Sequence, residues 1–133
     1  MIYIASKTKH APRWRELRAQ GVPIISTWID EAGKGETKSF SDLWDRCVLE
    51  ACTSYVLVAY REPGEIQKGS FIEIGAALAM RVPVFIVGYE EEQFSFRHHP
   101  RVTSCSTLQE ALTLAQAECS RLIKQHHDSL VYK

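Results

Sequence analysis

The chain has 133 residues, which suits a single domain with a core of its own, and 45% of them are hydrophobic, as in an ordinary soluble protein. Basic and acidic residues number 16 each, so the formal net charge is zero. This balance argues against a general binder of nucleic-acid polymers, which usually has a basic excess. It leaves room for a small anionic ligand, because one local basic group is enough to hold it. No apolar run approaches the ~20 residues of a membrane span, so we expect no membrane partner.

The four cysteines lie at positions 47, 52, 105 and 119, and none of their spacings is that of a zinc knuckle or a CxxC redox pair. No secretory signal is visible, so the sequence predicts reduced thiols in a cytoplasmic protein, with metal ligation as the alternative. A P-loop, a GxGxxG fingerprint and a Ser-His-Asp order are absent from the sequence.

Strand and helix patterns alternate from the first residues onward. Pro12 suits the first turn of a helix and Gly21 its end, and the β-branched Ile24 favours a strand. Ser41 is placed to cap a further helix, with Asp42 in its first turn. The predicted elements of this half are a strand over 2–5, a helix over 12–20, a strand over 22–27, a polar loop over 30–39, a helix from 41 to about 51 and a buried strand over 55–60.

The second half continues the alternation after a turn at 62–65. Its predicted elements are a helix from 69 to about 80, a buried strand over 82–87, a polar and aromatic loop over 89–100 that can cover a pocket, a short strand over 101–105 and a long amphipathic helix over 107–124. We expect one domain over residues 1–125 and a flexible tail over 126–133.

This alternation predicts an α/β fold with a mostly parallel sheet of four or five strands between two layers of helices. We expect a flavodoxin-like, Rossmann-like three-layer sandwich with strand order 2-1-3-4-5. In that order the connections diverge between strands 1 and 3, and ligands bind at such a point, outside the carboxyl ends of the strands. The loops there carry Ser6, Lys7, residues 60–68 and the residues around Gly88.

A lone acid, Glu73, stands in the first turns of the predicted helix over 69–80, between Ile72 and Ile74. The packed side of such a helix must be apolar, so a carboxylate there needs a reason. The positive end of the helix would stabilise it as an anion, at the edge of the ligand crevice. The alternative is a solvated residue that caps Gly69.

The pattern Gly69-x-x-x-Glu73-Ile-Gly75-x-Ala77, followed by a Val-Pro-Val strand, resembles the signature of the nucleoside 2-deoxyribosyltransferase superfamily, and the strand over 2–5 resembles its first strand. The resemblance implies that Glu73 is the nucleophile, that Tyr3 supports it, and that the protein is a homo-oligomer whose subunits share sites.

Three positions depart from that family's pattern. Gln67 stands where the family often has an acid, and Thr53-Ser54 stands where a helix usually ends with Asp. An acid on the preceding helix commonly contacts the base, and Asp42 and Asp45 both lie near that place. The resemblance therefore supports glycosidic chemistry better than a choice of base or phosphate.

Cleavage of an N-glycosidic bond builds positive charge on the sugar, which a carboxylate can stabilise or attack. We therefore expect an enzyme that cleaves or transfers at the N-glycosidic bond of a nucleoside or nucleotide, with Glu73 and Tyr3 as catalytic residues. No metal or organic cofactor is needed for this step. Two alternatives stay open: a non-catalytic nucleotide-binding module of the same fold, which the departures favour, and a glycohydrolase of NAD or a related ADP-ribose compound.

Residues near the predicted crevice offer chemistry for substrate binding. A Trp can stack on a base, an acid can accept from a base amino group, and a Lys can neutralise a phosphate. Gly69 permits close backbone approach and Ser70 offers a hydroxyl. For each, the alternative is ordinary packing, capping or solvation. The predicted substrate-binding residues are Ser6, Lys7, Trp28, Asp30, Asp45, Tyr60, Gly69 and Ser70.

Overall fold

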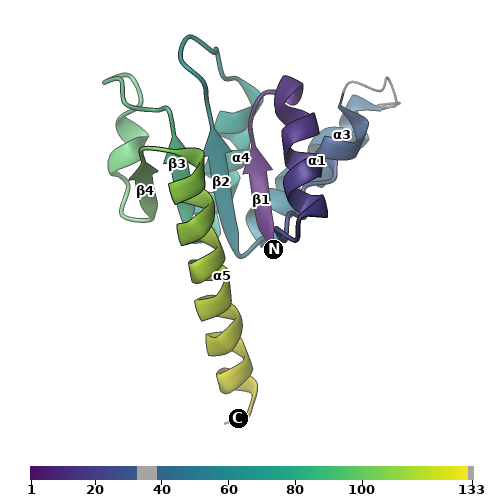
Figure 1. The fold of residues 1–133 in the computed structure, drawn as a ribbon, viewed down its shortest axis with the longest axis vertical. Helices are drawn as coiled ribbons and strands as arrows, with labels where there is room; N and C mark the ends of the chain where they lie inside the picture. The colour runs from purple at the N-terminus through teal and green to yellow at the C-terminus, as the bar shows by residue number, and fades with distance from the viewer. Residues whose placement is uncertain (33–38, 132–133) are drawn as a thin grey trace.

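The computed structural model describes residues 1–32 and 39–131, so most of the loop predicted over 30–39 lies outside the described residues. Within the described ranges, a four-stranded parallel sheet has the order β1-β2-β3-β4 (Figure 1). Its strands are β1 (Ile2–Ala5), β2 (Val56–Tyr60), β3 (Val84–Val87) and β4 (Val102–Cys105). The predicted α/β class with a parallel sheet is confirmed.

The segment predicted as a strand over 22–27 forms only an isolated parallel bridge, between Ile2 and Ile24. Backbone bonds from Ile2 to Pro23 and from Ile25 to Ile2, each 2.9 Å, hold it beside β1 on the side away from β2. Beyond them, the Ile4 amide donates to the Ser26 side chain at 2.7 Å, so a hydroxyl takes the place of a ladder carbonyl. The predicted five-strand order is therefore not confirmed, although this segment flanks β1.

Helices cover both faces of the sheet. In Figure 1, α5 crosses the front of β2 and β3, while α4 lies behind the sheet next to α3. The helical elements are η1 (Thr8–His10), α1 (Ala11–Ala19), α2 (Trp28–Glu31), α3 (Phe40–Thr53), α4 (Gly69–Ala79), η2 (Ser95–His98) and α5 (Leu108–Val131). Three of these were not predicted: η1 ahead of α1, α2 across the start of the 30–39 loop and η2 inside the 89–100 loop. This layering is compatible with a Rossmann-like three-layer fold.

The N-cap of α3 stands two residues earlier than predicted. Ser39, and not Ser41, caps it, and its hydroxyl accepts from the Asp42 amide at 3.2 Å. An N-cap side chain reaches the amide two or three positions on, so the cap that bonds Asp42 must stand at 39. Asp42 lies in the first turn as predicted.

The last helix is longer than predicted, since α5 continues through Val131 and residues 126–131 are helical rather than a tail. No Gly or Pro interrupts the sequence from 108 to 131, so nothing local ends the helix. The buried residues of α5 reach only from Ala111 to Cys119, and its second half projects from the body (Figure 1). Among the described residues, no helix is long and apolar enough to span a membrane.

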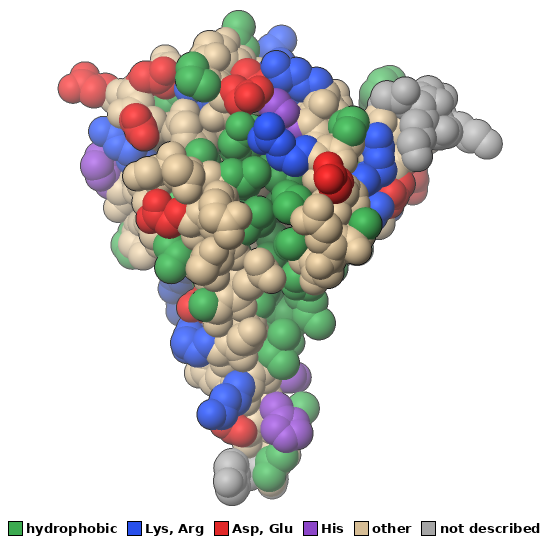
Figure 2. All heavy atoms as spheres, in the orientation of Figure 1, with side chains coloured by type: hydrophobic (Ala, Val, Ile, Leu, Met, Phe, Trp, Pro, Cys, Tyr) green, Lys and Arg blue, Asp and Glu red, His purple; other side chains and the backbone are tan. Residues whose placement is uncertain are grey.

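The core forms around β1, β2 and β3, while β4 at the edge of the sheet contributes only Cys105 to it. β1 is buried along its whole length, as are Val56 to Ala59 of β2 and all of β3. Such continuous apolar runs are typical of parallel strands covered on both faces. The strands point toward one end of the molecule, where basic and acidic side chains gather (Figures 1 and 2).

Two glycines after β2 and β3 adopt left-handed backbone angles, and they differ in their surroundings. Gly88 has φ +90°, and a Cβ there would lie 2.0 Å from the Arg61 carbonyl oxygen, whereas Gly64 has φ +83° and open space around it. Gly64→Ala should lose about 1–2 kcal/mol of unfolding free energy from backbone strain alone. Gly88→Ala should lose clearly more, because it adds a clash with backbone. Urea unfolding of both variants measures the difference, and equal losses would contradict this account.

Candidate functional site

A cavity of about 310 Å³ opens where β1 ends and the chain enters α4. Residues 6–8 and 66–70 form one part of its wall, and α3 contributes the part around Trp44. It lies beyond the carboxyl end of β1, which has β2 on one side and the Ile24 bridge on the other. The structure thus brings together Ser6, Lys7, Trp28, Gly69, Ser70 and Glu73 of the predicted site residues.

Glu73 lines this cavity and is only 9% exposed. Burial raises the pKa of its carboxyl group to about 8, Tyr3 acts to lower it, and repulsion from Glu50 raises it further. The expectation that the helix terminus would hold it as an anion is therefore wrong for the free protein. Glu73 lies beyond the first turn of α4, where the field of the helix has faded and desolvation prevails.

Tyr3 lies in β1, completely buried, with its phenol close to Glu73 and Cys47. Burial, together with the nearby Glu73 and Cys47, raises the pKa of the phenol far above its ordinary value, so Tyr3 keeps its proton. Its hydroxyl makes no hydrogen bond of regular geometry within the described part of the chain, although it is near enough to lower the pKa of Glu73. Tyr3 is thus a free donor next to the carboxyl group.

Cys47 completes the buried group, although the sequence placed it only on the apolar face of a helix. Burial is the main cause that raises the pKa of its thiol to about 11, so it is protonated at neutral pH. Leu43 and Cys47 are one turn apart on α3 and both line the cavity. A helical apolar pattern does not distinguish a core face from a cavity wall, so the sequence carried no signal for this role.

Two indole rings form the walls, and each is held differently. Trp28 is 7% exposed, and its Nε1 donates to the Ile4 carbonyl at 2.9 Å, so its orientation is set by β1. Trp44 is 38% exposed and rests against Gly69, where a Cβ would come within 2.8 Å of the ring. Gly69 was expected to let a ligand approach its backbone closely. In the structure the Trp44 ring lies where a side chain at position 69 would stand.

The mouth of the cavity is rich in hydrogen-bond donors. Lys7 and Lys68 are exposed there, and neither forms an ion pair with any described residue. Gln67 is 8% exposed, and its Nε2 has no hydrogen-bond partner among the described residues. Ser70 is buried at the start of α4 beside them. An oxyanion or carbonyl group on a ligand would satisfy these donors.

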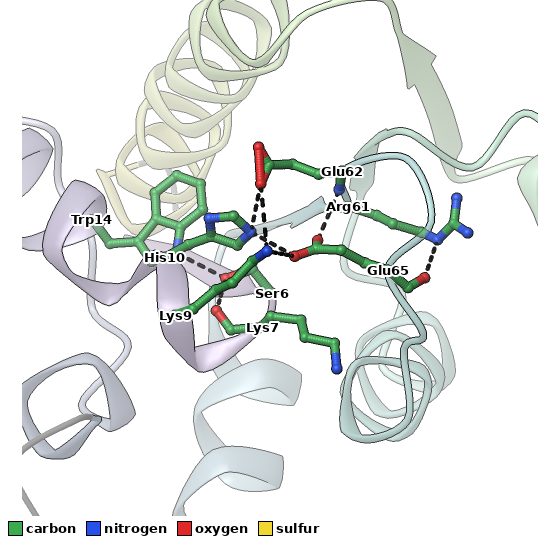
Figure 3. Close-up of polar contacts among 8 residues, drawn as sticks. All are labelled: Ser6, Lys7, Lys9, His10, Trp14, Arg61, Glu62 and Glu65. Atoms are coloured by element: carbon green, nitrogen blue, oxygen red, sulfur yellow. Dashed lines mark hydrogen bonds and ion pairs between the residues drawn. The ribbon is translucent and has the colours of Figure 1, made fainter.

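Ser6 is held in place by the chain itself. The Trp14 indole Nε1 donates to its hydroxyl at 2.8 Å, and the hydroxyl donates to the Lys7 carbonyl at 3.0 Å (Figure 3). Ser6 can therefore offer a ligand only an acceptor position. Thr8, Ala32 and Ile66 also line the cavity and were not predicted.

Three predicted substrate-binding residues lie outside the cavity. Asp30 pairs with Arg18 at the surface, and Asp45 is exposed on α3, turned away from the cavity that its neighbour Trp44 lines. Tyr60 packs edge-on against His10 and Trp14, and it lines a second cavity of about 560 Å³. Leu43, Trp44 and Cys47 lie on the side of α3 that lines the cavity, and at about 100° per residue Asp45 is on nearly the opposite side of the helix from Leu43.

Comparisons with protein-family models, with curated proteins and with solved structures found no match. The assignment of chemistry to this cavity accordingly depends on its geometry and on the residues that line it.

The buried carboxyl group predicts a pH-dependent effect of Glu73→Gln on stability. Between the ordinary pKa of 4.5 and the folded value of about 8, the folded protein holds a proton that the unfolded chain releases, so wild-type stability falls as pH rises through this interval. Glu73→Gln has no carboxyl group to ionise at this position, so its stability does not fall in this way. Its advantage should be absent near pH 4.5 and should grow by at most about 1.4 kcal/mol per pH unit up to pH 8.

Urea unfolding at several pH values measures this effect. Glu16→Gln is the matched control, because Glu16 is exposed on α1 and does not line the cavity. A stability gain for Glu73→Gln that stays constant from pH 5 to pH 8.5 would show that its carboxyl group does not titrate as described.

Proposed function

We propose that this protein cleaves or transfers the N-glycosidic bond of a nucleoside or nucleotide, with Glu73 as the attacking group. The observation that carries the proposal is a buried carboxyl group in the wall of a 310 Å³ cavity, with a protonated phenol beside it and two indole rings in the walls. A cavity of this size lies at the lower end of the range for small-molecule sites, about 300–1,000 Å³.

The arrangement supports a two-step reaction. The ionised Glu73 carboxylate attacks the anomeric carbon, the C–N bond breaks, and its electron pair leaves with the base, which takes a proton from solvent. Water or a second base then attacks the anomeric carbon of the sugar ester, and the carboxylate is released. In this reaction the Tyr3 hydroxyl, which has no hydrogen-bond partner of regular geometry among the described residues, donates to the carboxylate once Glu73 is ionised and lowers the free energy of the ionised form.

The walls and mouth support the choice of substrate class. Trp44 offers a partly exposed aromatic face on which a base can stack. Lys7 and Lys68 provide positive charge without partner carboxylates in the described ranges, and the Gln67 amide adds a buried donor. These groups favour a substrate whose sugar carries a phosphate over an uncharged nucleoside.

A homo-oligomer in the cytoplasm remains part of the proposal. On α3 and α4, which pack against each other, Leu49 and Ile72 are each more than half exposed, as is Met80 at the C-cap of α4. Large exposed apolar side chains on neighbouring elements are typical of protein–protein interfaces.

One observation favours the second candidate, a nucleotide-binding module without turnover. With a pKa of about 8, Glu73 is mostly protonated at neutral pH in the free protein, and a protonated carboxyl group is a poor nucleophile. The same cavity would then hold its ligand through hydrogen bonds alone. Activity measurements decide between the two functions.

A substrate panel tests the proposal directly. Wild type should release free base from at least one member of a set of nucleosides, their 5′-monophosphates and NAD, as measured by chromatography. Glu73→Gln should lower the rate by roughly 10³-fold or more, because the amide cannot form the sugar ester. Glu16→Gln should match wild type. Base release by Glu73→Gln at the wild-type rate would remove Glu73 from the reaction, and binding without any base release would favour the binding module.

The pH dependence of kcat/KM tests the protonation state of Glu73. A nucleophile must be ionised, so kcat/KM should rise as pH increases and level off above about pH 8. Tyr3→Phe should shift this rise to higher pH, because the phenol lowers the pKa of Glu73. A decrease of kcat/KM through pH 8 would mean that the protonated form is active and that Glu73 is a general acid.

A further inference from the structure

Next to the Glu73 cavity, three side chains with metal-binding atoms converge. His10 ends η1, and Glu62 and Glu65 belong to the turn after β2, as Figure 3 shows. One ligand atom from each residue lies within 4.8 Å of the other two. His10 and Glu65 are buried, and Glu62 is partly exposed.

We propose that His10, Glu62 and Glu65 bind a divalent transition-metal ion of the zinc type. His10 Nε2 lies 3.0 Å from Glu65 Oε2 and 3.4 Å from Glu62 Oε1. Zinc bonds of about 2.0–2.2 Å at tetrahedral angles separate two ligand atoms by about 3.3–3.6 Å. The two distances from His10 are thus already near the separation of two corners of a zinc tetrahedron, and the Glu62 and Glu65 oxygens lie within 4.8 Å of each other.

The surrounding structure holds these ligands in position. Glu65 uses its other oxygen, Oε1, to accept from the Glu62 amide at 2.8 Å, which leaves Oε2 directed at His10. The Arg61 side chain donates to the Glu65 carbonyl at 2.8 Å and fixes the turn. The His10 ring stands edge-on to the rings of Trp14 and Tyr60. Ligands fixed by neighbouring contacts lose little freedom when a metal binds.

The charge balance of the cluster also favours a divalent cation. Two carboxylates share this small space, and Lys9 Nζ lies 3.1 Å from Glu65 and 3.9 Å from Glu62. The Lys9 side chain is 62% exposed and free to withdraw. It acts as a monovalent substitute that a metal ion would displace.

The position of the cluster would let a metal ion enter from solvent, and it would let the bound ion link two segments of the chain. Glu62 also lines the 560 Å³ cavity, which provides a path from solvent. His10 and Glu65 are each two residues from a residue of the Glu73 cavity, Thr8 and Gln67 respectively. A bound metal would therefore tie together the two segments that form the mouth of that cavity. Its role is structural, and it does not depend on the glycosidic chemistry.

Isothermal titration of the metal-free full chain with ZnCl₂ tests the site. Wild type should bind one Zn²⁺ at this site, and His10→Ala and Glu62→Gln should each weaken that binding by at least about 10-fold. Lys9→Met should strengthen it, because the competing ammonium is removed. His98→Ala is the matched control for surface binding, since His98 is exposed on η2 and outside the cluster, and it should bind like wild type.

Thermal unfolding with and without Zn²⁺ provides a second readout that does not require His10→Ala to fold. Zn²⁺ should raise the Tm of wild type and of Lys9→Met, and it should leave the Tm of Glu62→Gln nearly unchanged, because a ligand stabilises only the state that binds it. The proposal is overturned if wild type binds no Zn²⁺, if Glu62→Gln binds it like wild type, or if only His98→Ala loses binding. Weaker binding by Lys9→Met would likewise show that the cluster is an ion-pair network alone.

Discussion

The loss of water around the Glu73 carboxyl group is the constraint on which the candidate site depends. The group is 9% exposed, burial raises its pKa to about 8, and the phenol of Tyr3 only partly offsets this penalty. A fold selected for stability alone would place an apolar side chain here, since burying an unpaired charge lowers the free energy of unfolding. The same desolvation makes the carboxylate reactive once it is ionised, because no hydration shell shields it from a sugar carbon. Desolvation of the Glu73 carboxyl group is therefore the origin both of the lost stability and of the proposed chemistry.

The end of the sheet to which the strands point concentrates the polar chemistry of the molecule. β1 and β2 end side by side, so the segments that follow them, residues 6–10 and 61–70, are brought together although more than 50 residues separate them in sequence. The cavity and the cluster of His10, Glu62 and Glu65 both form at this junction. Both arise from the same parallel pairing. Rigid strands beneath short polar segments provide the positioning that binding sites require.

Much of the architecture followed from local pattern. Continuous apolar runs identified β2 and β3, and the lone acid between isoleucines identified Glu73 as unusual. Where the predicted secondary structure was wrong, the cause was a local contact that hydrophobic patterns do not encode. Segment 22–27 has β-branched residues, but the Ser26 hydroxyl takes a ladder position, so only a bridge forms. The sequence predicts a flexible tail from residue 126, but α5 continues to Val131 because the segment contains no helix breaker. The end of α5 has no buried residue in the described structure.

By itself, the sequence determined the alternation of parallel strands and helices, and it marked Glu73, because hydrophobic periodicity and a misplaced charge are properties of the linear chain. Only the tertiary structure decided which polar residues share the cavity. It placed Gln67, Lys68 and Cys47 there, and it excluded Asp30, Asp45 and Tyr60. The direction of a side chain around a helix, or on either face of a strand, depends on where neighbouring elements pack. The pKa of Glu73 was decided in the same way, because desolvation is set by the atoms that surround a group and not by its neighbours in sequence.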